Sequence, residues 1–167
     1  MYFVKSIKSP LGKIDLVATD EALVALYTKE DEHKPLLEKA IKVTEHLVLC
    51  SVEKQLDEYF KGQRTDFSIS VKPTGTNFQE SAWRALQKIP FGKVWSYGEQ
   101  AKFLKKPKAQ RAVGGANGKN PIPIIIPCHR VIGATGKLTG FSGGMKMKIF
   151  LLKLEGHEVD HHGLKLI

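Results

Sequence analysis

The residues with the clearest chemical potential are Cys128, His129 and Arg130. They directly follow the apolar run Ile122–Ile126 and Pro127. A free thiol has a pKa of about 8.5, and a neighbouring base and positive charge raise its reactive thiolate fraction. The apolar run predicts a short buried strand whose pairing ends at Pro127, because proline cannot donate a ladder hydrogen bond. Cys128 is therefore expected as an exposed, activated nucleophile at the mouth of this strand.

This hypothesis depends on the local backbone. On a continuing strand, Cys128 and His129 would point to opposite faces, so a turn or a helix start is required at Cys128. The alternative is a buried structural cysteine beside a surface histidine. Cys50 has no comparable neighbours and is assigned to the core.

Glu155 occupies an unfavourable position for a carboxylate. A helix is expected to begin at Ser142 and to end at Gly156, which places Glu155 at its C-terminus. The helix macrodipole disfavours a negative charge there. A carboxylate kept in such a place can hold a cation or orient a histidine. The alternative is an exposed glutamate that the helix tolerates.

Three other chemistries fit these motifs less well. A metal site would need further ligands at suitable spacing around Cys128 and His129, so no metal is expected. A phosphate-binding loop is excluded because Val113 and Asn120 stand where Gly and Ser or Thr are needed. Residues 140–144 match a Gly-x-Ser-x-Gly elbow, but the chain is too short for the large parallel sheet that such an elbow requires.

Helix signals surround these residues in the second half of the chain. Thr76 with Gln79, and Ser96 with Glu99, form capping-box patterns, so a helix is expected to begin at each point. The first helix ends before Pro90. The second ends near residue 104 and is followed by a tight basic turn.

A further helix is expected over 107–116, with residues 117–118, Asn-Gly, as its C-terminal stop. Two helices joined by a short basic turn fit a helix-turn-helix. Each internal glycine costs a helix about 1 kcal/mol relative to alanine, and close approach of another backbone explains that cost. Another helix and a nucleic-acid backbone both fit, and Arg111 could reach past the small residues, which are Ala109, Ala112, Gly114, Gly115 and Ala116.

The first half, 1–72, is predicted to be a small α+β domain without catalytic residues. Its patterns predict antiparallel strands at 2–8, 13–18 and 22–28, helices at 33–48 and 51–61, and a strand at 66–71. Residues 72–75, Lys-Pro-Thr-Gly, form a plausible linker. The fold class is therefore α+β, with a mostly helical second domain at 73–167.

Charge is distributed very unevenly along the chain. Residues 1–72 contain 11 basic and 12 acidic side chains, whereas residues 73–167 contain 15 and 5. A basic half beside a neutral half indicates a polyanionic partner, most often nucleic acid. The alternative is that the charge serves solubility alone.

The two cysteines and the apolar runs bear on the compartment. Two cysteines allow at most one disulfide, which favours a reducing compartment with free thiols. No apolar run approaches the roughly 18 residues of a membrane helix, and the N-terminus has no signal-peptide pattern. A cytoplasmic protein that does not bind membranes is expected.

Residues 127–131, Pro-Cys-His-Arg-Val, resemble the active-site motif of the methylated-DNA–protein-cysteine methyltransferases, also called alkylguanine-DNA alkyltransferases. The resemblance covers about residues 76–157, and the variable N-terminal domain of that family resembles the first half more weakly. The further matching segments share order and spacing; they are 78–79, 96–97, 111–116, 120–121, 142–144 and 154–157.

This resemblance implies a one-way repair reaction on a flipped base. Cys128 would attack the alkyl carbon on the exocyclic oxygen of guanine, and more weakly of thymine, with His129 as its base through a water. Glu155 would orient His129, Tyr97 would donate a proton or hydrogen bond to the departing guanine, and Asn120 would hold the hinge. The thioether product makes this a single-turnover transferase without a cofactor. The residues expected to line the pocket are Pro123, Val131, Phe141, Ser142 and Gly143.

The resemblance also implies how DNA is bound. The second helix of the helix-turn-helix would enter the minor groove, where Ala112, Gly114 and Gly115 allow close approach. Arg111 would insert into the base stack and fill the space left by the flipped nucleotide. The expected partner is double-stranded DNA that contains alkylated guanine, bound by a monomer.

Some features depart from relatives in the family. Some members bind zinc through N-terminal cysteines and histidines, and with Cys50 alone in the first half no zinc is expected here. Phe141 stands where some relatives have Tyr, which leaves the tolerance for bulky alkyl groups open. Two other functions remain: a DNA-damage recognition module without enzymatic activity, and a cysteine hydrolase that turns over repeatedly.

Overall fold

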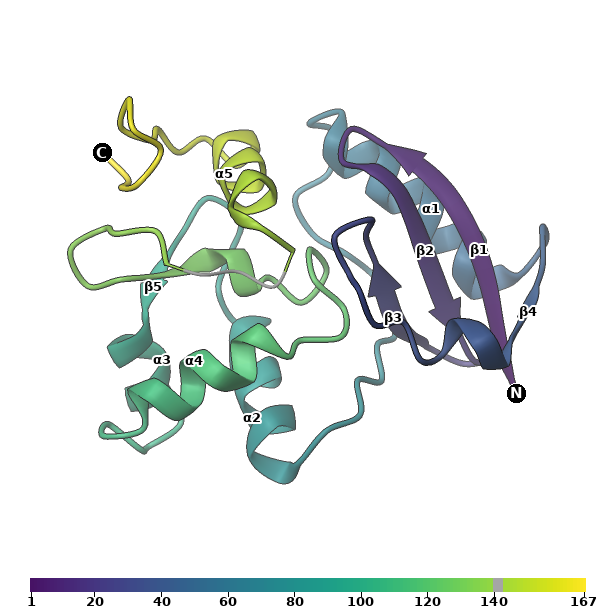
Figure 1. Cartoon of the computed structure of the whole chain (residues 1–167), viewed down its shortest axis with the longest axis horizontal. Helices are drawn as coiled ribbons and strands as arrows, with labels where there is room; N and C mark the ends of the chain where they lie inside the picture. The colour runs from purple at the N-terminus through teal and green to yellow at the C-terminus, as the bar shows by residue number, and fades with distance from the viewer. Residues whose placement is uncertain (140–142) are drawn as a thin grey trace. The chain divides into compact units, whose positions relative to one another are not determined.

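The chain forms two compact units, Met1–Thr74 and Gly75–Ile167 (Figure 1). The structure is a computed structural model that describes residues 1–139 and 143–167. None of the helices formed by these described residues is long and apolar enough to cross a membrane.

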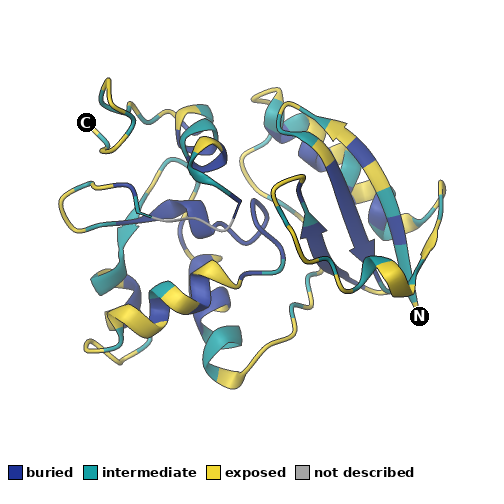
Figure 2. Ribbon diagram, viewed as in Figure 1, coloured by how far each residue is buried: buried dark blue, intermediate teal, exposed yellow. Residues whose placement is uncertain are grey.

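A four-stranded sheet in the order β3-β2-β1-β4 forms the first unit. The three predicted strands are present and antiparallel: β1 (Tyr2–Ser9), β2 (Gly12–Ala18) and β3 (Leu23–Tyr27). Ser9 pairs with Gly12, so a two-residue turn joins β1 to β2, and Gly12 adopts a φ of +90°. Strands β2 and β3 are mostly buried (Figure 2).

The predicted helix over 33–48 is wrong. This segment contains a short 3-10 turn, η1 (Leu37–Lys39), and a fourth strand, β4 (Ala40–Lys42), parallel to β1. Its backbone bonds to the open edge of β1, with Val43 N donating to the carbonyl oxygen of Val4 at 3.0 Å. The unpaired N–H and C=O groups at the edge of β1 need hydrogen-bond partners, and this need overrides the helical spacing of the apolar residues in the segment. The following helix, α1 (Leu47–Phe60), begins earlier than predicted.

The predicted strand over 66–71 is also wrong, since this segment forms only one isolated bridge and a side chain bonds the backbone of Ser68. Gln55 on α1 accepts a hydrogen bond from Ser68 N at 2.8 Å and donates to the Ser68 carbonyl oxygen at 3.3 Å. Val71 forms an isolated bridge with Leu23. Cys50 lies half-buried on α1 rather than in the core.

Three helices pack together in the second unit. They are α2 (Asn77–Leu86), α3 (Tyr97–Phe103) and α4 (Gln110–Gly118). The predicted capping box of α2 is complete, with both Thr76 and Gln79 bonded to the opposite backbone. At α3, Ser96 accepts from Glu99 N at 3.1 Å, but the Glu99 carboxylate contacts the Ser96 hydroxyl, so the cap is one-sided.

Helix α4 begins later than predicted and continues through its predicted stop. Asn117 remains inside the last turn because its side chain is buried and exchanges two hydrogen bonds with Gln100 on α3, at 3.0 and 2.8 Å. Helices α3 and α4 with their basic turn form the predicted helix-turn-helix, whose outer face is exposed (Figure 2).

The predicted strand Ile122–Ile126 is a buried turn instead. Ile126 N donates to the carbonyl oxygen of Ile122 at 3.0 Å, and Ile124 adopts a φ of 76°. Pro123 leaves the middle of this segment without one ladder N–H, and Pro121 and Pro127 leave none directly before and after it. The segment is apolar because it is buried, and its apolar character carries no information on strand pairing.

The remainder of the unit completes the surroundings of Cys128. A 3-10 turn, η2 (Cys128–Arg130), leads into β6 (Val131–Ile132), which pairs in parallel with β5 (Trp95–Ser96). Helix α5 (Met145–Leu154) follows Gly144, whose φ is 91°. Ser142, the predicted helix start, lies outside the described residues.

Candidate active site

Cys128 begins the 3-10 turn η2, so the change of backbone direction required by the hypothesis is present. The expectation of an exposed thiol is wrong, since only 3% of the residue is exposed. Burial raises the pKa of the Cys128 thiol to about 11, although a hydrogen bond from Asn120, the charge of Lys148 and nearby backbone N–H groups act in the opposite direction. The thiol is thus held protonated in a site already built to receive a thiolate.

His129 is fully buried rather than on the surface, and it is paired with Glu155. Its Nε2 lies 2.7 Å from Glu155 Oε2. An ionised carboxylate can only accept, so Nε2 must carry the ring proton and Nδ1 holds a free lone pair. Nδ1 has no hydrogen-bond partner among the described residues. Burial lowers the pKa of His129 despite Glu155, so the ring is neutral and able to take a proton.

Arg130 explains how Glu155 remains ionised inside the protein. Its Nε and Nη2 donate to the two carboxylate oxygens at 2.8 and 3.1 Å, and Nη1 donates to the carbonyl oxygen of Ile89 at 2.6 Å. Burial alone would raise the pKa of Glu155, but His129 and Arg130 together lower it to about 2. Glu155 caps the C-terminus of α5 and is 4% exposed, so the alternative of an exposed glutamate is wrong.

Lys148 is a part of this site that the sequence analysis missed. It lies on α5, is 1% exposed, and its Nζ donates to the carbonyl oxygen of Val131 at 2.7 Å. Burial lowers the pKa of Lys148 to about 8, while interaction with Cys128 raises it. The helical spacing could have revealed it. Lys148 falls on the same face of the helix as Met145 and Leu152, where an apolar residue such as leucine is usual.

Replacing Lys148 with methionine is expected to make the protein more stable and less reactive. A lysine with a lowered folded-state pKa opposes folding at pH 7, and this penalty fades as the pH rises from about 8 towards 10.5. We expect Lys148→Met to raise the free energy of unfolding at pH 7 by about 1–3 kcal/mol. Loss of the cation should raise the pKa of Cys128 and slow alkylation about tenfold.

Urea unfolding at several pH values, followed by tryptophan fluorescence, measures the stability effect, because both tryptophans, Trp83 and Trp95, lie in this unit. Lys153→Met, an exposed position on the same helix, is the matched control. Unchanged stability together with an unchanged alkylation rate would contradict a role for the buried cation.

Asn120 shapes the turn that precedes Cys128. Its Nδ2 donates to the carbonyl oxygen of Ile126 at 2.8 Å, and its Oδ1 accepts from Ile122 N at 3.0 Å. The same side chain favours the thiolate of Cys128. Asn120 therefore joins the end of the helix-turn-helix to the nucleophile, the place where a hinge was expected.

The hydrogen bond of the Tyr97 side chain goes to a residue outside the Cys128 cluster. Its hydroxyl forms a short hydrogen bond with Oγ1 of Thr139. A Cβ added to Gly114 on α4 would lie 3.6 Å from the Tyr97 ring, so the glycine permits close packing between α3 and α4. The other expected DNA-contacting residues, Arg111, Ala112 and Gly115, are exposed on α4.

The expected pocket residues are only partly described. Pro123, Val131 and Gly143 are buried. Phe141 and Ser142 lie outside the described residues. The described residues bring together one buried thiol, one neutral histidine with a free lone pair, and a carboxylate that sets its tautomer. Such a group can deprotonate a thiol for attack on an electrophilic carbon.

Two family models match the chain over most of its length. The model described as 6-O-methylguanine DNA methyltransferase, ribonuclease-like domain, matches residues 2–73. The model described as 6-O-methylguanine DNA methyltransferase, DNA binding domain, matches residues 77–157.

Known proteins resemble the chain in sequence and in structure. The methylated-DNA–protein-cysteine methyltransferase of Methanosarcina acetivorans is 46% identical over 149 residues, which are 89% of this chain and 95% of the relative. The protein of that name from Mycobacterium leprae is 42% identical over 95% of both chains. The Mycobacterium tuberculosis O6-methylguanine methyltransferase has a TM-score of 0.85 at 42% identity, over 93% of each chain. A structure of Mycobacterium tuberculosis OGT in complex with DNA has a TM-score of 0.81 at 42% identity, over 92% of this chain and 91% of that one.

Proposed function

Because the chain belongs to the 6-O-methylguanine DNA methyltransferase family, we propose that Cys128 is the residue on which it carries out the activity of that family. The protein is a methylated-DNA–protein-cysteine methyltransferase that reverses alkylation damage in DNA directly. The alkyl group moves from the exocyclic oxygen of guanine to the thiol of Cys128.

The observation that carries this assignment is the hydrogen bond between His129 and Glu155, from which the tautomer of His129 follows. Glu155 accepts a hydrogen bond from Nε2 at 2.7 Å. The buried Nδ1 is therefore left as the acceptor for the thiol proton, directly or through one water. The thiolate then forms a carbon–sulfur bond while the carbon–oxygen bond of the lesion breaks. The electron pair stays on guanine, which gains one proton as the thiol loses one. The thioether is stable in water, so each molecule reacts once and needs no cofactor.

Tyr97 and Asn120 support different parts of this step. Tyr97 donates a hydrogen bond to the departing guanine. Asn120 holds the turn before Cys128 and stabilises the thiolate. Pro123, Val131, Phe141, Ser142 and Gly143 line the pocket for the flipped base.

Double-stranded DNA with an alkylated guanine is the partner, bound by one copy of the protein in the cytoplasm and without a membrane. The second unit carries 15 basic and 5 acidic side chains, which suits a phosphate backbone. The exposed small residues of α4, Ala112 and Gly115, allow the helix to approach the minor groove closely. Gly114 lets the same helix pack against Tyr97.

Mass spectrometry tests the proposal most directly. The protein is mixed with a duplex that carries one O6-methylguanine, and its peptides and the DNA are analysed. We expect one methyl group on Cys128 in each protein molecule and an unmodified guanine in the duplex. An unmodified Cys128 with tight duplex binding would favour the damage-recognition module. Repeated turnover on an ester or peptide would favour a cysteine hydrolase.

Replacement of Arg111 by alanine is expected to separate base flipping from chemistry. Arg111 is exposed on α4 and can fill the space that the flipped nucleotide leaves, which offsets the few kcal/mol that flipping costs. We expect Arg111→Ala to slow methyl transfer from duplex DNA about 10- to 100-fold. Its reaction with the free base analogue O6-benzylguanine should remain within about twofold of the original. Lys119→Ala, an exposed cation just after the same helix, is the control, and equal losses on both substrates would contradict the role of Arg111.

A further inference from the structure

The phenol of Tyr97 has a partner that the reaction outlined above does not use. Its hydroxyl forms a hydrogen bond with Oγ1 of Thr139, 42 residues further along the chain. Tyr97 is the first residue of α3, and its ring lies against Gly114 of α4. The ring is therefore held by the helix-turn-helix, whereas its hydroxyl is held by a different segment.

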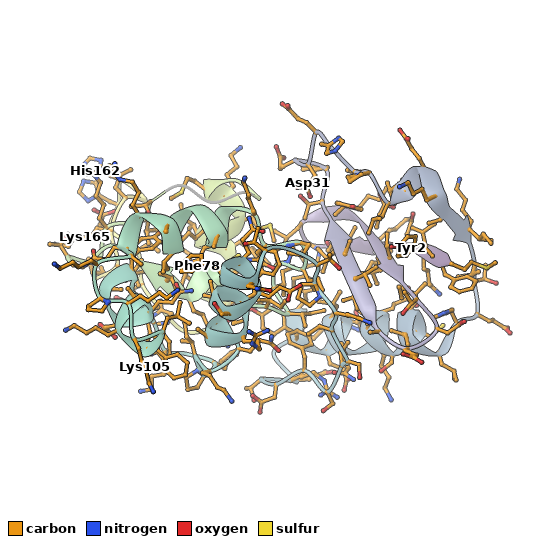
Figure 3. All side chains as sticks on the ribbon, turned by 90° about the horizontal axis from the view of Figure 1, so that it is seen from below. Tyr2, Asp31, Phe78, Lys105, His162 and Lys165 are labelled. Carbon is orange, nitrogen blue, oxygen red and sulfur yellow. The ribbon has the colours of Figure 1, made fainter. Side chains whose placement is uncertain are left out.

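The segment that carries Thr139 is itself anchored. Leu138 is buried in an apolar cluster with Ile132 and Leu152, and its N–H donates to the carbonyl oxygen of Leu164 at 2.8 Å. Lys137 and Lys165 form an antiparallel bridge beside this bond. His162 and Lys165, both labelled in Figure 3, belong to this C-terminal segment. The backbone next to Thr139 is thus fixed by the core and by the C-terminus, so its hydroxyl meets Tyr97 at a defined place.

The two hydroxyls can share their protons in only one way once a base is bound. Each hydroxyl has one proton and can also accept. If Tyr97 donates to guanine, it has no proton left for Thr139, and their contact persists only if Thr139 donates. A hydrogen-bond chain then runs from Thr139 to Tyr97 to the base, and each bond in such a chain strengthens the next.

We propose that Thr139 is a positioning residue that donates its hydroxyl proton to Tyr97 and so directs the phenol proton to the departing guanine. The proposal rests on the proposed role of Tyr97. Thr139 forms and breaks no covalent bond and keeps its own proton throughout. It acts on the leaving base alone and leaves the thiol of Cys128 untouched.

Single-turnover methyl transfer from a duplex with one O6-methylguanine tests this role. Valine has the shape of threonine without the hydroxyl, and we expect Thr139→Val to react about three- to tenfold more slowly. Thr139→Ser, which retains the donor, should recover most of the rate. Thr135→Val is the matched control, because Thr135 is an exposed threonine of the same segment, and its rate should not change.

Two further measurements separate positioning from a structural effect. Alkylation of Cys128 by iodoacetamide requires no departing base, so its rate should be the same in the Thr139→Val variant and the original protein. In a Tyr97→Phe background, where the phenol is absent, Thr139→Val should change the rate of methyl transfer by less than about twofold.

Several results would overturn the proposal. One is an unchanged rate of methyl transfer in Thr139→Val, and another is a Thr139→Ser variant that reacts as slowly as Thr139→Val. The others are an equal slowing of iodoacetamide alkylation in Thr139→Val, and a full additional loss of the methyl-transfer rate when Thr139→Val is combined with Tyr97→Phe. If the original protein transferred no methyl group at all, the assignment of the reaction to Cys128 would fail instead. The two failures are therefore distinguishable.

Discussion

Cys128→Ala is expected to transfer no methyl group while it still binds methylated duplex DNA. Alanine has no atom that can accept the alkyl carbon, and removal of a covalent nucleophile slows catalysis on the order of 10⁶-fold. Binding should persist because phosphate contacts depend on the basic residues and the exposed face of α4, and Cys128 is 3% exposed. Quantitative mass spectrometry measures transfer, and a gel-shift titration measures affinity.

The second cysteine supplies the control for this experiment. Cys50 is half-buried on α1 in the first unit, so Cys50→Ala should accept one methyl group per molecule at the original rate. If the Cys128→Ala variant still restored guanine in the duplex, the methyl group would have to be accepted by a residue other than Cys128. Equal binding by both variants and the original protein, with repair by none of them, would identify a damage-recognition module.

Local signals predicted the elements whose backbone finds its partners close by in the sequence. The side chains of Thr76 and Gln79 cap the N-terminus of α2 through bonds to nearby backbone. The capping box can therefore be recognised from the sequence without any tertiary contact. The strands β1, β2 and β3 follow in sequence and pair with their neighbours, which short-range alternation can indicate.

Two of the failures depend on a partner that is distant in sequence, whereas the third depends on prolines and an asparagine within or beside the segment. Residues 40–42 become a strand because β1 offers an open edge, and Asn117 stays helical because Gln100 pairs with it. Segment Ile122–Ile126 is apolar through burial, while its prolines and the side chain of Asn120 prevent a strand.

The site was predicted best where a residue contradicted its local context. A carboxylate at a helix C-terminus drew attention to Glu155, and the structure provides the reason in His129 and Arg130. The exposure of Cys128 was misjudged because its strand was a turn. Lys148 was missed because one lysine among many in a basic half is inconspicuous unless its place on the buried face of α5 is noticed.

Glu155→Gln is expected to weaken both the fold and the reaction. Glutamine keeps the size but loses the charge, which leaves Arg130 buried without an ionic partner. Breaking a buried pair in this way costs about 3–5 kcal/mol. Without the carboxylate, Nε2 of His129 no longer has a partner that must accept, so the tautomer with a free Nδ1 is no longer enforced. We expect methyl transfer to slow at least about 100-fold, the lower range for loss of a positioned base.

The stability effect of Glu155→Gln is expected to depend on pH in a way that identifies the loss of the carboxylate charge. The folded-state pKa of Glu155 is about 2, below its ordinary value of 4.5, so its stabilising effect is complete above pH 4.5 and is lost as the pH falls towards 2. The difference in unfolding free energy between Glu155→Gln and the original protein should therefore shrink over that range. Urea unfolding followed by tryptophan fluorescence measures it, and Glu158→Gln, an exposed carboxylate of the same unit, should show no such difference.

A double variant separates the structural and chemical parts of the Glu155 effect. Replacing both members of a buried pair with apolar residues of similar size is often neutral or stabilising, so Arg130→Met with Glu155→Leu should regain most of the lost stability. It should not regain the rate, because His129 still lacks the acceptor that sets its tautomer. A double variant that is both stable and fast would show that Glu155 serves only to neutralise Arg130, and the base role of His129 would then need another explanation.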